Sequence, residues 1–175
     1  MNNTIYLEKY NQKIMLIRGT EKTAYTLKLF FANVITLMEV YLSEALISIV
    51  KGDRGLIIKV TESKSFNNHK IALRTAFTND IEQYILSQIN HTIFHNLNDV
   101  FILYRDVFGI EFRQNRRIID SIKTRHHIVH RNGMDFDGNP VEISETDLEN
   151  VIEVVNDFLF DIDTKLYVKF PVGPS

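Results

Sequence analysis

The segment from Tyr25 to Lys51 constrains the fold more than any other part of the sequence. Its apolar residues recur at the three- and four-residue spacing of an α-helix and occur on nearly all sides of it. Such a helix needs cover on more than one side, and a second copy of the chain is one source of that cover. Glu39 and Glu44 interrupt the segment, and carboxylates are costly inside a bilayer. We therefore expect a buried core helix that ends at Gly52, with no membrane contact.

Three further segments carry the helical period, and strand-like alternation is scarce. They begin near Thr78, near Gln114 and at Ser144, which forms a capping-box pattern with Asp147. The first should bend or break near residues 90–96, and the second should end at Asn132-Gly133. Residues 51–55 are expected to form a turn, residues 61–70 a loop, and the first 24 a small irregular segment. The sequence predicts an all-α, up-and-down bundle forming one domain over residues 1–175.

Composition removes several classes of function. The 175 residues include no Cys, which excludes disulfides, thiolate zinc sites and cysteine nucleophiles. The chain is 45% hydrophobic and 24% charged, with three Pro, as is ordinary for a globular domain. The N-terminus has no basic stretch followed by an apolar one, so we expect no signal peptide and a cytoplasmic location.

The net charge of −2 is unevenly distributed. Residues 105–131 hold seven Arg or Lys against three acids, whereas residues 132–163 hold ten acids and no Arg or Lys. This asymmetry indicates either a polyanion site beside a solvated acidic face or two elements that pair within the fold.

The densest cluster of chemically useful side chains is RHHIVHRNG, residues 125–133, at a helix C-terminus. Imidazoles titrate near neutrality, the negative end of a helix favours their protonated form, and Arg presents a fork of donors suited to phosphate. His126 and His130 should share a helix face, whereas Arg125 and His130 are about 140° apart. Either the long Arg125 side chain wraps round the helix, or a second copy completes the site.

This string resembles the HEPN superfamily, whose signature is R-x(4–6)-H and which appears here as R-HHIV-H. VITLMEVYLSEALI, FGIEF and the acidic capped helix after DGNP are similar to stand-alone HEPN domains in order and spacing, so the resemblance covers about residues 25–163. It implies a bundle of four to five helices and a homodimer with a composite active site. Active members are metal-independent endoribonucleases, and many serve in toxin–antitoxin or antiviral systems beside a partner protein.

The resemblance assigns roles residue by residue. Arg125 would bind and polarise the scissile phosphate, and His130 would act as general base or acid. His126, Arg131 and Asn132 would support catalysis or bind substrate, and Glu39 would be a supporting partner from the first long helix. No cofactor and no metal are expected.

The residues themselves favour the same chemistry, because no compact carboxylate cluster stands out as a nuclease metal site. Without a metal-generated hydroxide, the nearest nucleophile is the substrate's own 2′-hydroxyl, which only RNA has. We therefore expect RNA cleavage to a 2′,3′-cyclic phosphate. The alternative is a non-catalytic HEPN module that dimerises and binds a nucleotide, an RNA or a protein.

Two other readings of the histidines remain open. His91 and His95 have the spacing of a zinc-binding helix, but the string HTIFH lacks the Glu that a zincin uses as base. His126, His127 and His130 are a second candidate metal group. In both cases ordinary surface histidines are the simpler interpretation.

Overall fold

The computed structural model describes residues 3–66, 80–91, 94, 96–112 and 115–171. Within these ranges it has seven named helices and no strand, apart from an isolated bridge between Met134 and Pro140. The all-α prediction is confirmed, with more helices than the four to five expected. The chain divides into two compact units, Met1–Tyr41 with Arg113–Ser175, and Leu42–Phe112.

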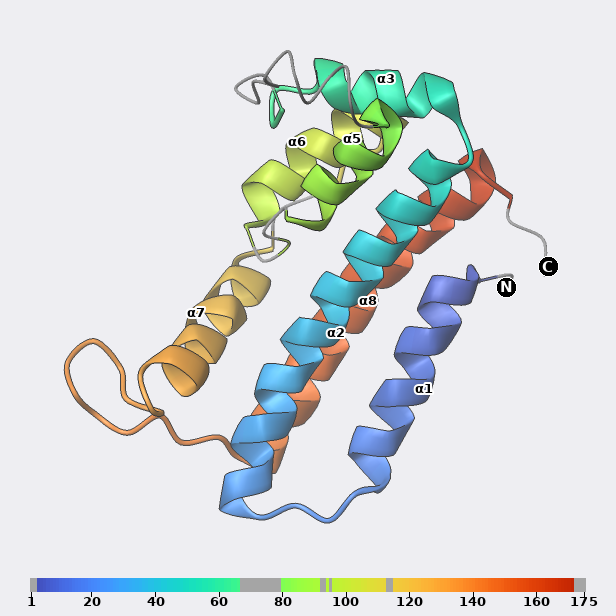
Figure 1. Cartoon of the computed structure of the whole chain (residues 1–175). Helices are drawn as coiled ribbons and strands as arrows, with labels where there is room; N and C mark the ends of the chain where they lie inside the picture. Colours follow the sequence, from blue (N-terminus) through green and yellow to red (C-terminus); the bar gives the residue numbers. More distant parts are fainter. Residues whose placement is uncertain (1–2, 67–79, 92–93, 95, 113–114, 172–175) are drawn as a thin grey trace. The chain divides into compact units, whose positions relative to one another are not determined.

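The first unit is built on four helices (Figure 1). They are α1 (Ile5–Gly19), α2 (Ala24–Lys51, through Tyr41), α7 (Arg116–His130) and α8 (Glu145–Lys169). Both α1 and α7 contact α8. The capping box predicted at the start of α8 is present, with the Ser144 side chain accepting from the Asp147 N–H and the Asp147 side chain from the Ser144 N–H.

Helix α1 corrects the expectation of an irregular N-terminal segment. Thr4 caps it by accepting from the Leu7 N–H. The buried residues of α1 follow the helical period: Tyr6, Leu7, Tyr10, Ile14 and Ile17. The pattern is hard to recognise in the sequence because Ile5, Met15 and Leu16 are apolar but exposed on the other side.

A buried carboxylate joins three helices of this unit. Asp163 of α8 is 1% exposed. It accepts hydrogen bonds from the Thr4 N–H at 3.0 Å, from the Thr4 hydroxyl, and from the Tyr41 hydroxyl of α2 at 2.7 Å. These donors satisfy the buried charge, and they fix the start of α1 and the middle of α2 to α8.

The second unit contains the remainder of α2 together with α3 (Arg54–Glu62), α5 (Ile81–Asn90) and α6 (Leu97–Phe108). The predicted break near residues 90–96 separates α5 from α6. Helix α3 was not predicted, because Gly52 and Gly55 suggested a turn. Asp53 between them is an N-cap that accepts from the Gly55 and Leu56 N–H groups. The expected loop over 61–70 starts late, since α3 includes Thr61 and Glu62, and residues 67–70 lie outside the described residues.

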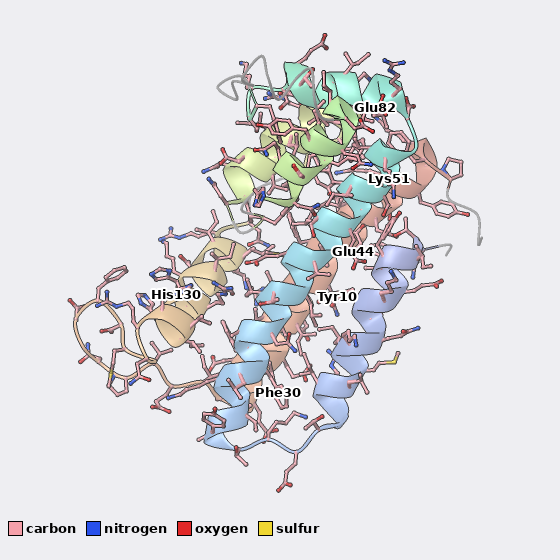
Figure 2. The ribbon with its side chains drawn as sticks, in the orientation of Figure 1. Tyr10, Phe30, Glu44, Lys51, Glu82 and His130 are labelled. Carbon is pink, nitrogen blue, oxygen red and sulfur yellow. The ribbon has the colours of Figure 1, made fainter. Side chains whose placement is uncertain are left out.

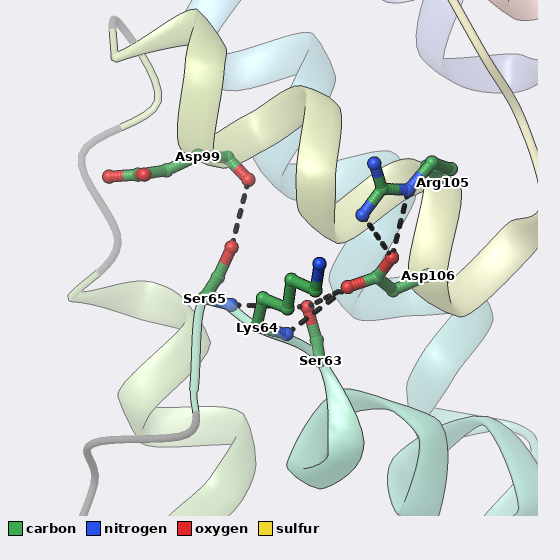
Figure 3. A network of polar contacts seen from close by, with 6 residues as sticks. All are labelled: Ser63, Lys64, Ser65, Asp99, Arg105 and Asp106. Atoms are coloured by element: carbon green, nitrogen blue, oxygen red, sulfur yellow. Dashed lines mark hydrogen bonds and ion pairs between the residues drawn. The ribbon is translucent and has the colours of Figure 1, made fainter.

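Polar contacts tie the end of α3 to α6 (Figure 3). Asp106 accepts from the Ser63 hydroxyl at 3.0 Å and the Lys64 N–H at 3.1 Å, and it binds the Arg105 guanidinium at 2.8 Å. Although partial desolvation opposes them, these donors hold the pKa of Asp106 below its ordinary value. The network belongs to the scaffold of the second unit.

Among the described helices, α2 is long and apolar enough to cross a membrane by length and composition. Core helices of soluble proteins meet the same criteria. Val34, Ile35, Met38, Leu42 and Leu46 of α2 are fully buried within the protein.

We predict that Asp163→Ala destabilises the protein strongly. The substitution leaves the Thr4 N–H and the hydroxyls of Thr4 and Tyr41 buried without their acceptor, at about 1–3 kcal/mol each. Denaturant unfolding followed by circular dichroism should show a loss of about 3 kcal/mol or more. Tyr41→Phe removes one donor and should cost about 1.5 kcal/mol. An unchanged midpoint for Asp163→Ala would contradict this role.

Candidate active site at the C-terminal end of helix α7

The stop signal predicted at Asn132-Gly133 ends helix α7. The Arg131 and Gly133 N–H groups both donate to the His127 carbonyl, at 3.2 and 3.0 Å. Asn132 and Gly133 take left-handed conformations, with φ of 52° and 75°. Gly adopts this conformation without penalty and Asn tolerates it better than most residues. The reversal places the last helical turn beside the loop that follows it.

Arg125 and His130 meet within one chain (His130 is labelled in Figure 2). Arg125 Nη1 lies 3.3 Å from His130 Nε2. The half-buried Arg125 side chain therefore wraps round the helix, so a second copy is not needed to bring the two groups together. His130 itself is exposed and accessible to a ligand.

The arginine can take only one role in this contact. A guanidinium has only donors, so Arg125 donates and the His130 Nε2 lone pair accepts. That lone pair is also the one that a general base uses. Arg125 Nε is buried and, among the described residues, has no hydrogen-bond partner. This buried donor is not itself accessible to a ligand from solvent.

The other two histidines of the helix end lie beside this pair. The ring centroids of His126 and His130 are 5.0 Å apart, which confirms that they share a face. His127 lies next to His126, with ring centroids 6.2 Å apart. Partial desolvation and then the positive charges of His130, His127, Arg131 and Arg125 lower the pKa of His126. This differs from the expectation that the helix C-terminus favours the protonated form.

A structured loop follows the helix. The Asp135 carboxylate accepts from the Asp137 and Asn139 N–H groups at 2.9 and 2.8 Å, and from the Asn139 side-chain amide. The Asn139 backbone bond, together with these other donors, lowers the pKa of Asp135. The Val141 N–H also donates to the Gly133 carbonyl at 2.8 Å and closes the loop at its base.

The loop carries an aromatic residue that the sequence analysis did not single out. The Arg131 guanidinium carbon lies 4.7 Å from the centroid of the Phe136 ring, and the His127 centroid is also 4.7 Å away, nearly perpendicular. Arg131 further donates to the Asp135 carbonyl. An aromatic residue among Asp, Asn and Gly, outside any helical pattern, was the available signal for Phe136.

The remaining predicted site residues are less closely placed. Asn132 is exposed and shapes the turn through its backbone. Glu39 is half-buried on α2, in the same unit as α7. His91 is exposed at the end of α5 in the other unit, and His95 lies outside the described residues. Among the described residues, no group of three or more His, Asp or Glu is arranged to hold a metal ion.

An open pocket of about 480 Å³ lies along another face of α7. Arg117, Asp120, Ser121 and Thr124 line it from α7, whereas neither Arg125 nor His130 does. The pocket is lined further by Phe31, residues 141–143 and the first turns of α8. The Arg125–His130 pair therefore lies outside this pocket.

The acidic segment forms ion pairs with the N-terminal helices. Arg18 of α1 binds Glu149 at 2.8 Å, and Lys28 of α2 binds Glu142 at 3.1 Å. Asp120, an acid of the basic segment itself, pairs with Arg116 and Lys123. At the end of α7, His126, His130 and Arg131 are exposed.

We predict that an NMR titration gives a pKa for His126 below the ordinary 6.5, and that Arg131→Gln raises it by removing a neighbouring charge. The unfolded chain then binds this proton more readily than the folded one. The contribution of His126 to the free energy of unfolding is therefore present when the pH is above the pKa of this histidine in the unfolded chain. It is lost as the pH falls through the lower pKa of His126 in the folded protein. Arg116→Gln, about 15 Å away along the helix, should leave the pKa of His126 unchanged. An equal pKa in the parent and Arg131→Gln would contradict the stated cause.

Comparison of the chain with protein-family models, with curated proteins and with solved structures finds no match.

Proposed function

We propose that this protein is a metal-independent endoribonuclease of the HEPN type, which cleaves RNA through its own 2′-hydroxyl and leaves a 2′,3′-cyclic phosphate. The observation that carries the proposal is the 3.3 Å contact between Arg125 Nη1 and His130 Nε2. It joins a phosphate-binding donor and a proton acceptor at the exposed end of one helix. The R-x4-H spacing supplies the resemblance that first suggested these two residues.

Arg125 is proposed to bind the scissile phosphate. Its side chain is half-buried along the helix, and its guanidinium moves from His130 to the phosphate on binding. The guanidinium offers several donors to the phosphoryl oxygens, on which negative charge builds up in the transition state. A donor held in position for such a charge contributes about 10²–10³-fold in rate.

His130 is proposed to take the proton of the attacking 2′-hydroxyl. When Arg125 turns to the phosphate, its contact with His130 Nε2 is released and the lone pair becomes available. The 2′-oxygen then bonds to phosphorus, its proton passes to Nε2, and the bond from phosphorus to the 5′-oxygen breaks. General base catalysis of this kind contributes about 10²–10⁴-fold.

His126 is proposed to deliver the proton that the departing 5′-oxygen needs. It lies beside His130, and partial desolvation and then neighbouring positive charges lower its pKa in the free protein. A bound phosphate offsets those charges and should raise the pKa, so that the protonated form is available where the leaving group departs. The pair of imidazoles thus provides one acceptor and one donor of protons.

The biological setting follows the resemblance: a cytoplasmic toxin or antiviral effector, acting as a homodimer beside a restraining partner protein. Exposed apolar side chains on the first unit are consistent with a homodimer. They include Met15 and Leu16 of α1, and Leu29 and Val40 of α2.

The central prediction concerns cleavage by the purified protein in excess EDTA. The parent should cut single-stranded RNA to fragments with cyclic-phosphate ends, while His130→Ala and Arg125→Ala should each lower the rate at least about 100-fold. Gel analysis of end-labelled RNA measures the rate and the chemistry of the ends. A substrate with a 2′-deoxy sugar at the cleaved position should resist the parent.

His91→Ala is the matched control, because His91 is an exposed histidine at a helix end in the other unit. It should cut at the parental rate. Parental activity in His130→Ala would overturn the role of His130. Absence of cleavage by every variant and by the parent would favour the non-catalytic binding module.

Mixing two inactive variants tests whether a dimer shares catalytic groups between chains. Because Arg125 and His130 meet within one chain, we expect Arg125→Ala mixed with His130→Ala to remain inactive. Refolding the variants together and assaying at micromolar concentration measures this. Recovery of about a quarter or more of the parental rate would show that the productive pair comes from two chains.

A further inference from the structure

Phe136 is a large apolar side chain that the fold exposes. It is 72% exposed at the tip of the loop that follows α7. Exposure of one aromatic residue is ordinary on a flexible segment, but this loop is closed by hydrogen bonds at its base and within its turn. The ring is therefore held in a fixed place in water and does not fill a core.

The surroundings of the ring indicate the chemistry of its partner. The Arg131 guanidinium lies over the ring, and His127 contacts it nearly at right angles. His127 is one helical turn from His130, so the ring lies close to the proposed catalytic pair. An open aromatic surface flanked by cationic donors is complementary to a flat, electron-rich group carried on a chain of phosphates.

We propose that Phe136 is a stacking platform for an unpaired nucleobase next to the phosphate held by Arg125. This inference rests on the proposed function and adds the substrate class, namely single-stranded RNA. Bases in a duplex are already stacked and paired, so they cannot reach the ring without being splayed out. Every base has a π-face, so stacking does not depend strongly on the sequence. The platform should therefore prefer single-stranded over double-stranded RNA without preferring a particular base.

The platform depends on the loop as well as on the ring. Asp135 accepts three hydrogen bonds within the turn, and Arg131 binds the Asp135 carbonyl while its guanidinium covers the ring. The loop is thus ordered before RNA arrives, and little entropy is lost when a base stacks. Arg131 in this role positions Phe136, and its charge contributes to phosphate binding.

The absence of Trp from the chain allows a direct test. Phe136→Trp creates a protein with a single tryptophan, whose emission is quenched when a base stacks on the indole. The probe is a 2′-O-methyl oligonucleotide, which keeps bases and phosphates but has no free 2′-hydroxyl and cannot be cut. We expect saturable quenching by this single strand, and little by an abasic oligonucleotide of the same length or by a perfect duplex.

Val168→Trp is the matched control. Val168 is 77% exposed, near the far end of α8. It lies roughly 35 Å along the helix from Ser144, where α8 begins after the loop that carries Phe136. A tryptophan at position 168 should therefore show no quenching by the oligonucleotide. In cleavage assays Phe136→Ala and Phe136→Leu should raise KM about 5- to 100-fold while kcat changes little, and Phe136→Tyr should stay near the parent. Leu keeps the apolar bulk without the π-face, so it separates stacking from simple burial.

The outcomes separate this inference from the proposed function. Quenching of Phe136→Trp without cleavage by the parent would support the platform and overturn the nuclease. Cleavage that depends on His130, with no quenching and unchanged KM in Phe136→Leu, would overturn the platform alone. A change of Phe136→Trp emission with protein concentration, in the absence of RNA, would place the ring against a second copy and also overturn it.

Discussion

The carboxylate of Asp163 holds together the helices on which the candidate site is built. A buried charge is tolerated only when donors replace the water it has lost, and here Thr4 and Tyr41 provide them. The same carboxyl group lies at the start of α1, where it accepts hydrogen bonds from Thr4, the N-cap residue. One interaction therefore sets the position of α1 and α2 against α8. Because α7 packs on α8, this scaffold supports the end of α7 that carries Arg125 and His130.

The candidate site differs from the Asp163 cluster because groups of like charge lie next to one another there. Its positive and titratable groups are crowded at one helix end, where partial desolvation and then the neighbouring positive charges lower the pKa of His126. In water such repulsion is weak enough for the fold to tolerate, yet it is relieved when an anion arrives. Within this cluster Arg125 Nη1 and His130 Nε2 lie 3.3 Å apart. In the free protein the two proposed reactants thus contact each other, and in the proposed mechanism a phosphate would replace one of them.

Local sequence signals predict the boundaries of the helices around the candidate site. They do not predict contacts between side chains that are far apart in the sequence. Gly52, the Asn132-Gly133 stop and the Ser144 capping box each gave a helix boundary, because such signals act within a few residues. Helix α1 was missed because exposed apolar residues blurred its pattern, and α3 because its N-cap Asp53 lay between glycines. Spacing alone left open whether Arg125 reached His130, since that depends on the path of a long side chain. The position of Phe136 depends on a loop whose hydrogen bonds no periodicity records.

The turn at the end of α7 has a consequence for the chemical ageing of the protein. Asn-Gly and Asp-Gly steps degrade when the glycine nitrogen loses its proton and attacks the preceding side chain to form a succinimide. In this chain both such steps lie beside the cationic cluster, at Asn132-Gly133 and Asp137-Gly138. The Gly133 N–H is engaged by the His127 carbonyl at 3.0 Å, and the Gly138 N–H by the Asp135 carbonyl at 3.3 Å. The bonds that shape the loop therefore also slow its covalent decay, and deamidation at Asn132, which would set a new carboxylate among the arginines and histidines, should become fast only after the loop has opened.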